Sequence, residues 1–394
     1  MRSQKVFFLS SLALLVVFAL WWLQPPAFFS NKSLPLSPAL TPTSGSEKAL
    51  QTPSLQVESF VSDLNVPWSI VFTSPERILV TERPGRVRVV ENGRLLEEPL
   101  RVFTEVSNRS EEGLMGMTLD LNYAANSYIY LCLAYRATNG RVFDKVIRVI
   151  DSGDGLIDDL VIIDGIPAAA NHAGCRLRFG PDEKLYISTG DASERNLSQD
   201  LTSLAGKILR INTDGSIPDD NPFPNSAVFS YGHRNPQGFD WNPISGALIA
   251  TEHGPSGNDG PGGGDEVNLI QAGQNYGWPE VSHQQSKEGM INPLLVFTPA
   301  IAPASGMFYL SLVLSQLTNT FLFGMLRGEG IMQVFFDEAG QVRDYQKLVE
   351  VEVGRVRDIV EGPDGFVYFT TSNRDGRGKA RSGDDHIFRL SPTD

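Results

Sequence analysis

Short alternations of apolar and polar residues follow one another from about residue 57 to the C-terminus. They are rich in β-branched and aromatic residues and are bounded by Pro, Asp, Asn or Gly, as in GPDEKLYISTGD from Gly180. A period of two with turn residues on either side predicts β-strands. No segment from Gln56 onward shows the periodicity of a long amphipathic helix, so the pattern predicts an all-β protein.

The same turn-and-strand unit recurs at intervals of roughly 45 to 75 residues. Its six copies begin at Ser74, Asn122, Gly180, Asn242, Thr318 and Gly362. Radial repetition of such units predicts a six-bladed β-propeller of four-stranded antiparallel blades over residues 57–394. Because the loops at one end of a propeller channel carry its site, function has to be argued from loop residues.

The N-terminal segment is interpreted as a targeting segment and not as part of the folded domain. Basic residues Arg2 and Lys5 precede an apolar stretch over residues 6–23, which is typical of an export signal. Its 18 residues are long for a cleaved signal and close to the roughly 20 that span a bilayer, so a cleaved signal and a membrane anchor both stay open. Residues 24–56 are rich in Pro, Ser and Thr and predict an extended linker. We therefore expect an exported protein, periplasmic or extracellular.

The net charge excludes some classes of binding partner, and the cysteine content excludes some classes of disulfide and metal site. The formal net charge of −13 argues against nucleic acid or an anionic lipid surface as a partner of the main body. Two cysteines, Cys132 and Cys175, exclude a disulfide scaffold and a cysteine-rich zinc site. Both lie in apolar runs, so one disulfide bridge and two buried thiols are equally compatible with the sequence.

Two loop segments carry side chains suited to acid–base and anion chemistry. His172, just before the third copy, is a candidate general base because an imidazole can accept a proton near neutral pH, although a lone histidine is more often structural. Arg234 and Asn235, before a Pro-Gln-Gly turn, form a fork of hydrogen-bond donors; the alternative is a solvated arginine.

Two further segments suggest a cation and an anion. The Gly/Asp-rich stretch between Glu252 and Trp278 offers closely spaced acids and turn carbonyls, as calcium prefers, but could be a glycine loop with incidental acids. Strand alternation puts Arg355 and Arg357 on one face, about 7 Å apart. Such a pair needs either a bridging anion or full exposure to solvent.

Taken together, the motifs resemble the soluble quinoprotein sugar dehydrogenases, and the aldose sugar dehydrogenase branch more than the glucose enzyme. The resemblance runs in family order from about Val57 to the C-terminus. Each motif is weak alone, but jointly they are specific. They are VPWSIVF, LVTERPGRVRVV, EEGLMGM, HAGCRLRFGPDEKLYISTGD, GHRNPQG, TEHGP, GGDEVNLI, NYGWP, APASGMFY and GRVRDIVEGPDGFVYFTTS.

The resemblance implies a propeller that holds pyrroloquinoline quinone (PQQ) and calcium and oxidises aldose sugars at the anomeric carbon, passing electrons to an external quinone or cytochrome. It assigns His172 as the base and Asp191 as the residue that orients it. Arg234 and Asn235 are placed beside the quinone oxygens. The other implied roles are cofactor binding by Arg327, Arg355 and Arg357; calcium on PQQ held by the carbonyls of Gly254 and Pro255; and a second, structural calcium held by Glu266 and Tyr276.

The chain also departs from the family pattern. Glu111 stands where the family often has a substrate-contacting glutamine, which bears on sugar preference. The loop SGNDGPGG after Pro255 is longer than usual, and the stretch from His283 to Pro299 lacks the usual aromatic–glycine run. Two alternatives are a calcium-dependent, lactonase-like hydrolase on the same kind of propeller, and a non-catalytic propeller that binds sugar or protein. The hydrolase would need several carboxylates around one metal, and the binding protein would tolerate loss of His172.

Overall fold

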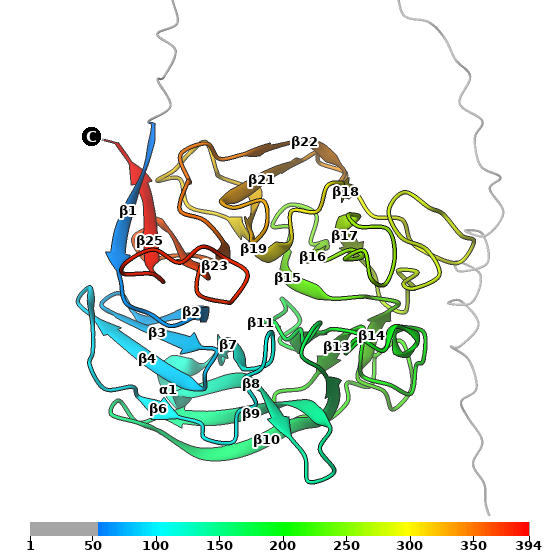
Figure 1. Cartoon of the computed structure of the whole chain (residues 1–394), viewed down its shortest axis with the longest axis horizontal. Coiled ribbons are helices and arrows are strands. Elements are labelled where there is room, and N and C mark those ends of the chain that lie inside the picture. Colours follow the sequence, from blue (N-terminus) through cyan, green and yellow to red (C-terminus); the bar gives the residue numbers. More distant parts are fainter. Residues whose placement is uncertain (1–53, 394) are drawn as a thin grey trace, which may run out of the picture. The chain divides into compact units, whose positions relative to one another are not determined.

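The computed structural model describes residues 54–393, and these form the six-bladed β-propeller that the repeats predicted (Figure 1). The expected export signal or anchor over residues 1–23 lies outside the described residues, as does the expected linker except for its last three positions. The first strand begins at Leu55, two residues before the expected boundary. None of the helices in the described part of the chain has the length and apolar character needed to cross a membrane.

Six antiparallel sheets surround a central channel, and each blade runs outward from an innermost strand (Figure 1). The innermost strands are β2 (Pro67–Ser74), β7 (Leu114–Leu119), β11 (Leu177–Phe179), β15 (Pro236–Trp241), β19 (Pro303–Tyr309) and β23 (Val356–Glu361). The second strands are β3 (Arg77–Glu82), β8 (Tyr128–Arg136), β12 (Leu185–Thr189), β16 (Leu248–Glu252), β20 (Thr320–Met325) and β24 (Val367–Thr371).

The outer half of each blade completes the ring. The third strands are β4 (Arg86–Glu91), β9 (Val142–Asp151), β13 (Lys207–Ile211), β17 (Asp265–Ile270), β21 (Ile331–Phe336) and β25 (Ile387–Pro392). The outermost strands are β5 (Arg94–Leu95) with β6 (Arg101–Val102), β10 (Leu156–Ala168), β14 (Val228–Tyr231), β18 (Leu295–Phe297), β22 (Val342–Lys347) and β1 (Leu55–Val61). Because β1 pairs with β25, the beginning of the described chain closes the last blade and locks the ring. Among residues 54–393, helical structure is limited to α1 (Tyr123–Asn126) and the 3₁₀ turn η1 (Arg195–Ser198).

Apolar side chains pack between neighbouring blades, and a polar contact crosses the channel itself. Tyr130, Ile187 and Leu209 belong to one buried cluster that joins the second and third blades. In the channel, Arg176 forms a 2.9 Å ion pair with Asp358 from the opposite part of the chain. Both side chains are buried, so each charge is neutralised by the other where water is excluded.

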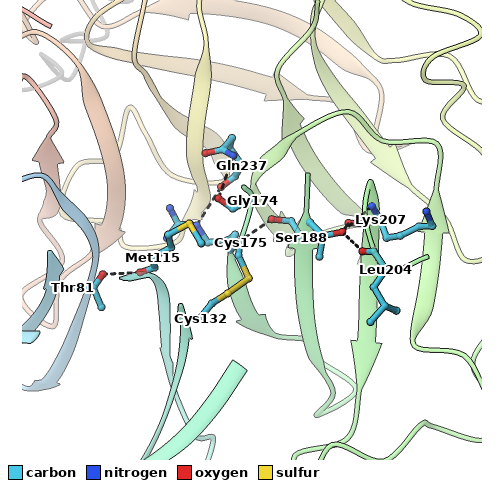
Figure 2. The surroundings of a disulfide bond; sticks show 11 residues. Thr81, Met115, Cys132, Gly174, Cys175, Ser188, Leu204, Lys207 and Gln237 are labelled. Carbon is cyan, nitrogen blue, oxygen red and sulfur yellow. Dashed lines mark hydrogen bonds between the residues drawn. A yellow bond between two sulfur atoms is a disulfide. The ribbon is translucent and has the colours of Figure 1, made fainter. Parts of the chain in front are cut away.

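Cys132 and Cys175 form a disulfide, which decides between the two possibilities that the sequence left open. The bridge joins β8 to the segment just before β11, that is, the second blade to the third (Figure 2). Neither cysteine is exposed to solvent. Since His172 lies three residues before Cys175, the bridge also anchors the loop that carries the candidate base.

Removing this bridge is expected to lower the free energy of unfolding by about 3–4 kcal/mol, because it closes a loop with a sequence separation of 43 residues. The measurement is urea unfolding of the Cys132→Ala/Cys175→Ala variant against the oxidised wild type. Wild-type protein reduced by a dithiol is the control, because it loses the bridge and keeps both sulfur atoms. Equal unfolding free energies for reduced and oxidised wild type would contradict the expectation.

Candidate active site at one end of the channel

The predicted site residues come together because of where they stand in each blade. Most of them lie just before an innermost strand or just after a second strand, and in antiparallel blades these two positions meet at the same end of the channel. There the structure has a cavity of about 650 Å³. Most of the predicted residues line it: Glu111, His172, Asp191, Arg234, Gly254, Pro255, Arg327 and Arg355.

His172 and Asp191 form a hydrogen-bonded pair at the cavity wall. Nδ1 of His172 lies 2.6 Å from Oδ1 of Asp191. The carboxylate of Asp191 also accepts hydrogen bonds from the indole of Trp278 and the backbone N–H of Ser193, both at 2.8 Å. Because a carboxylate only accepts, Nδ1 of His172 carries the proton in this pair, and Nε2 is left as the basic nitrogen. His172 itself has a φ of 59°, so its loop turns sharply at the candidate base.

Glu111 is held inside the protein by both of its carboxylate oxygens. Oε2 accepts the backbone N–H of His172 at 2.7 Å, and Oε1 accepts Nη1 of Arg377 at 2.5 Å. Arg377 also donates to Oδ1 of Asn171 at 2.8 Å. Burial alone would raise the pKa of Glu111, but Arg377 and His253 outweigh it and lower the pKa to about 2. The residue predicted to contact substrate thus supports the His172 loop.

The long glycine loop after Pro255 also has a defined contact. Asp259, inside this loop, accepts Nε of Arg234 at 2.8 Å, while Nη1 of Arg234 donates to the carbonyl oxygen of His253 at 3.2 Å. Arg234 is nearly fully buried, and its guanidinium lies 5.5 Å from the ring of Trp278. The loop is therefore not a glycine tether with incidental acids, because one of its acids orients Arg234.

Arg355 and Arg357 are buried, so the solvent-exposed alternative for this pair is wrong. Arg355 lines the cavity and donates to Asp375 through Nε and Nη2 at 3.0 and 2.7 Å. Arg357 does not line it; its Nη1 donates to Oε1 of Gln237 at 2.9 Å, and its Nε has no partner. Burial lowers the pKa of Arg357 to about 10, which still leaves it charged at neutral pH.

Asn235 does not line the cavity, whereas Arg327 does. Asn235 is fully buried behind the cavity; its Oδ1 accepts Nε2 of Gln237 at 2.9 Å, and its Nδ2 has no hydrogen-bond partner. Through Gln237, Asn235 is linked to Arg357, so this buried chain contains two donor atoms without acceptors. Arg327 is exposed on the cavity wall.

Glu266 and Tyr276 line a second, small cavity next to the first, and Gly254 and Pro255 border both. Glu252 lies with them, and burial together with the charge of Glu252 raises the pKa of Glu266. The side-chain oxygen of the neighbouring Asn268 is buried without a donor. The hydroxyl of Tyr276 is engaged, since it donates to the Leu269 carbonyl at 2.5 Å, so Tyr276 can offer a cation only its backbone carbonyl.

Several residues of the site were not singled out from the sequence. His253 lines the cavity and donates from Nε2 to the Pro303 carbonyl at 2.9 Å; burial lowers its pKa. Asp265 accepts backbone N–H groups of Gly254 and of two residues before β19. His253 and Asp265 lie in the motifs TEHGP and GGDEVNLI, so a motif could have pointed to them. Asp375 and Arg377 lie in a loop that contains none of the motifs.

Over most of its length, the chain is similar to known sugar dehydrogenases. A family model described as glucose/sorbosone dehydrogenase matches residues 64–380. The aldose sugar dehydrogenase YliI of Escherichia coli is 32% identical over 346 residues, covering 82% of this chain and 91% of that protein. The uncharacterized protein slr1608 of Synechocystis is 35% identical, with coverages of 82% and 86%. The PQQ-bound aldose sugar dehydrogenase of Streptomyces coelicolor is 32% identical with a TM-score of 0.76, covering 86% of this chain and 99% of that one.

Proposed function

Because the chain belongs to the glucose/sorbosone dehydrogenase family, we propose that it oxidises aldose sugars at the anomeric carbon to lactones, with PQQ and calcium. The family gives its general role, which is that of a sugar dehydrogenase. The proposal of this particular reaction rests on one observation: the same cavity is lined by the His172–Asp191 pair and by several guanidinium groups. A base, an anion site and an adjacent cation site then lie at one end of one channel.

The residues present fit a polyanionic cofactor such as PQQ. Arg234, Arg327 and Arg355 supply positive charge to the cavity wall. Nδ2 of Asn235 and Nε of Arg357 are buried donors without acceptors, and leaving such groups unpaired costs about 1–3 kcal/mol each. Neither atom lines the cavity, so a ligand with carboxylate and carbonyl oxygens would satisfy them by reaching past the cavity wall into the channel. We assign cofactor binding to these five residues.

The residues also fit calcium. Gly254 and Pro255 line both cavities, and the Gly263 and Gly264 carbonyls lie close to Gly254. The Pro255 carbonyl accepts the backbone N–H of Gly263 at 3.2 Å, which leaves it a second lone pair for a cation. Glu252 and Glu266 line the smaller cavity, where their carboxyl groups repel each other without a cation, although Nδ2 of Asn268 donates to both, at 3.3 and 3.1 Å. Hard oxygen ligands of this kind suit calcium. We assign Gly254 and Pro255 to the catalytic ion and Glu266 with the Tyr276 carbonyl to a structural one.

In the proposed mechanism, Nε2 of His172 takes the proton from the anomeric hydroxyl group of the sugar. Asp191 then stabilises the imidazolium through the 2.6 Å bond to Nδ1, and Trp278 keeps Asp191 in place. Glu111 holds the backbone of His172 at the cavity wall. Arg234, fixed by Asp259, maintains positive charge where negative charge develops. When bound, PQQ supplies the quinone that accepts the hydride, and calcium supplies Lewis acidity.

We also propose that the protein is exported, with the segment over residues 6–23 as its signal or anchor. The disulfide between Cys132 and Cys175 supports export, because such bridges persist mainly outside the reducing cytosol. Export also places the enzyme where a quinone or a cytochrome can take its electrons. Detecting the protein in the cytoplasmic fraction after expression from its native signal would contradict this part of the proposal.

Reconstitution tests the function directly. Purified protein is incubated with PQQ and calcium, and dye reduction is followed with several aldoses. We expect saturable reduction, lactone as the product and no activity without PQQ. Lactone hydrolysis without dye reduction would instead favour the lactonase-like alternative. Sugar binding without either reaction would favour the non-catalytic propeller.

A further inference from the structure

A basic loop borders the mouth of the cavity. It comprises residues 372–383, between β24 and β25, and contains four basic residues, Arg374, Arg377, Lys379 and Arg381. Arg377 lines the cavity, and Gly378 packs closely against the side chain of Arg355. The loop therefore forms part of the wall of the proposed site and also faces solvent.

The loop exposes positive charge and hides its negative charge. Arg374, Lys379 and Arg381 are exposed, and none of these three side chains has a hydrogen-bond or ion-pair partner among residues 54–393. Asp375, the loop's acid, is paired with Arg355, and the next two acids, Asp384 and Asp385, are buried. Solvent at the cavity mouth thus meets only the cations of this loop.

This patch contrasts with the rest of the protein. The chain has a net charge of −13, so a positive surface beside this cavity is not a consequence of composition. Exposed Arg195 and Arg327 extend the positive rim around the same cavity. Clusters of one sign at a cleft attract oppositely charged partners and raise association rates by roughly 10- to 10³-fold.

We propose that the basic loop docks an electron-carrier protein with an acidic face, which collects the electrons that sugar oxidation releases. The inference rests on the proposed function, because a carrier is needed only if the protein oxidises aldoses. Each aldose oxidised to a lactone gives up two protons and two electrons. Two one-electron carriers, arriving one after the other, then take one electron each. The position favours such a carrier because electrons must leave through the cavity mouth that the loop borders.

The sign of the ionic-strength effect tests the proposal without a mutation. The probes are ferricyanide, an anion, and hexaammineruthenium(III), a cation, each varied at saturating aldose with PQQ- and calcium-loaded protein. With a net charge of −13, the whole protein would repel ferricyanide, and added salt would speed its reduction. If the basic loop governs the encounter, raising ionic strength from about 0.01 M to about 0.3 M lowers kcat/KM for ferricyanide about 10-fold and raises it for hexaammineruthenium(III).

A charge-reversal variant tests the location. Arg374→Glu/Lys379→Glu/Arg381→Glu is expected to lower kcat/KM for ferricyanide and for an acidic c-type cytochrome about 10-fold at low ionic strength. The kcat/KM for aldose at saturating hexaammineruthenium(III) should stay unchanged, since none of the three residues lines the cavity. The matched control Arg94→Glu/Lys184→Glu/Arg343→Glu makes the same change in net charge away from the cavity and should have little effect.

Three outcomes would overturn the proposal. One is ferricyanide reduction that speeds up with added salt, and another is an equal response of the loop variant and its control. The third, no reduction of any acceptor with any aldose, would overturn the proposed function as well and is thereby distinguished from the first two. A neutral version, Arg374→Gln/Lys379→Gln/Arg381→Gln, with an unchanged thermal unfolding midpoint, excludes misfolding as the cause of a rate loss.

Discussion

Replacing His172 with alanine is expected to lower turnover by about 10²- to 10⁴-fold, the range for losing a general base. The nitrogen that would take the proton disappears, while Asp191 stays fixed by Trp278 and Ser193. The measurement is kcat at saturating aldose and dye with protein loaded with PQQ and calcium. PQQ affinity should change little, because the guanidinium groups assigned to the cofactor are unaltered.

Two further variants make this result specific. His386→Ala removes a histidine whose Nδ1 lies 2.9 Å from the Ser59 hydroxyl, outside the cavity, and should leave kcat unchanged. Asp191→Asn keeps the size of the side chain, but an amide can donate to Nδ1 and leave the proton on Nε2. A loss of up to about 10⁴-fold is then expected. A His172→Ala enzyme with wild-type turnover would remove His172 from the mechanism.

Removing calcium with a chelator is expected to lower activity about 100-fold or more and to lower the free energy of unfolding by about 3–4 kcal/mol. The first effect is the loss of a Lewis acid, worth several kcal/mol at the transition state. The second is the loss of a ligand present at roughly 100 to 1,000 times its dissociation constant. The carboxyl groups of Glu252 and Glu266 would then face each other without a cation. Activity and thermal unfolding are measured before chelation, after it and after addition of calcium or magnesium.

Glu266→Gln separates the two ions. Glu266 lines only the smaller cavity, so this variant should lose most of the calcium-dependent stabilisation while keeping the carbonyls of Gly254 and Pro255 for the catalytic ion. Glu338→Gln, at an exposed turn, makes the same chemical change and should behave as wild type. Full activity and an unchanged unfolding midpoint in excess chelator would contradict the assignment of calcium to this protein.

Much of the site could be placed from the sequence because its residues occupy equivalent positions in successive blades. His172, Asn235 and Arg355 all stand immediately before or a few residues before an innermost strand, and Asp191 follows a second strand. A propeller brings these positions to one end of its channel whatever their separation along the chain. The motifs identified the candidate residues, and the repeat predicted the end of the channel at which they meet.

The contacts within the site could not be predicted in the same way. Arg355 and Arg357 were expected either to share an external anion or to face solvent, yet both are buried and Arg355 is paired with Asp375 of the protein itself. Glu111 was expected to contact substrate; it lines the cavity, but the contacts of its two oxygens with His172 and Arg377 were not foreseen. In each case the partner lies in another loop, and strand patterns carry no information about which loops touch across the mouth of the channel.

By itself, the sequence determined the all-β class and the six blades, because alternation and turn residues act over a few positions at a time, and its motifs named most of the predicted residues that line the cavity. Only the tertiary structure decided that Cys132 bonds to Cys175, that Asp259 orients Arg234 and that Arg377 reaches Glu111, 266 residues away. The first two join segments of the same or neighbouring blades, whereas the pairing of Arg377 with Glu111 depends on ring closure. The pairing of β1 with β25 fixes the last blade beside the first, and distance in space then replaces distance along the chain.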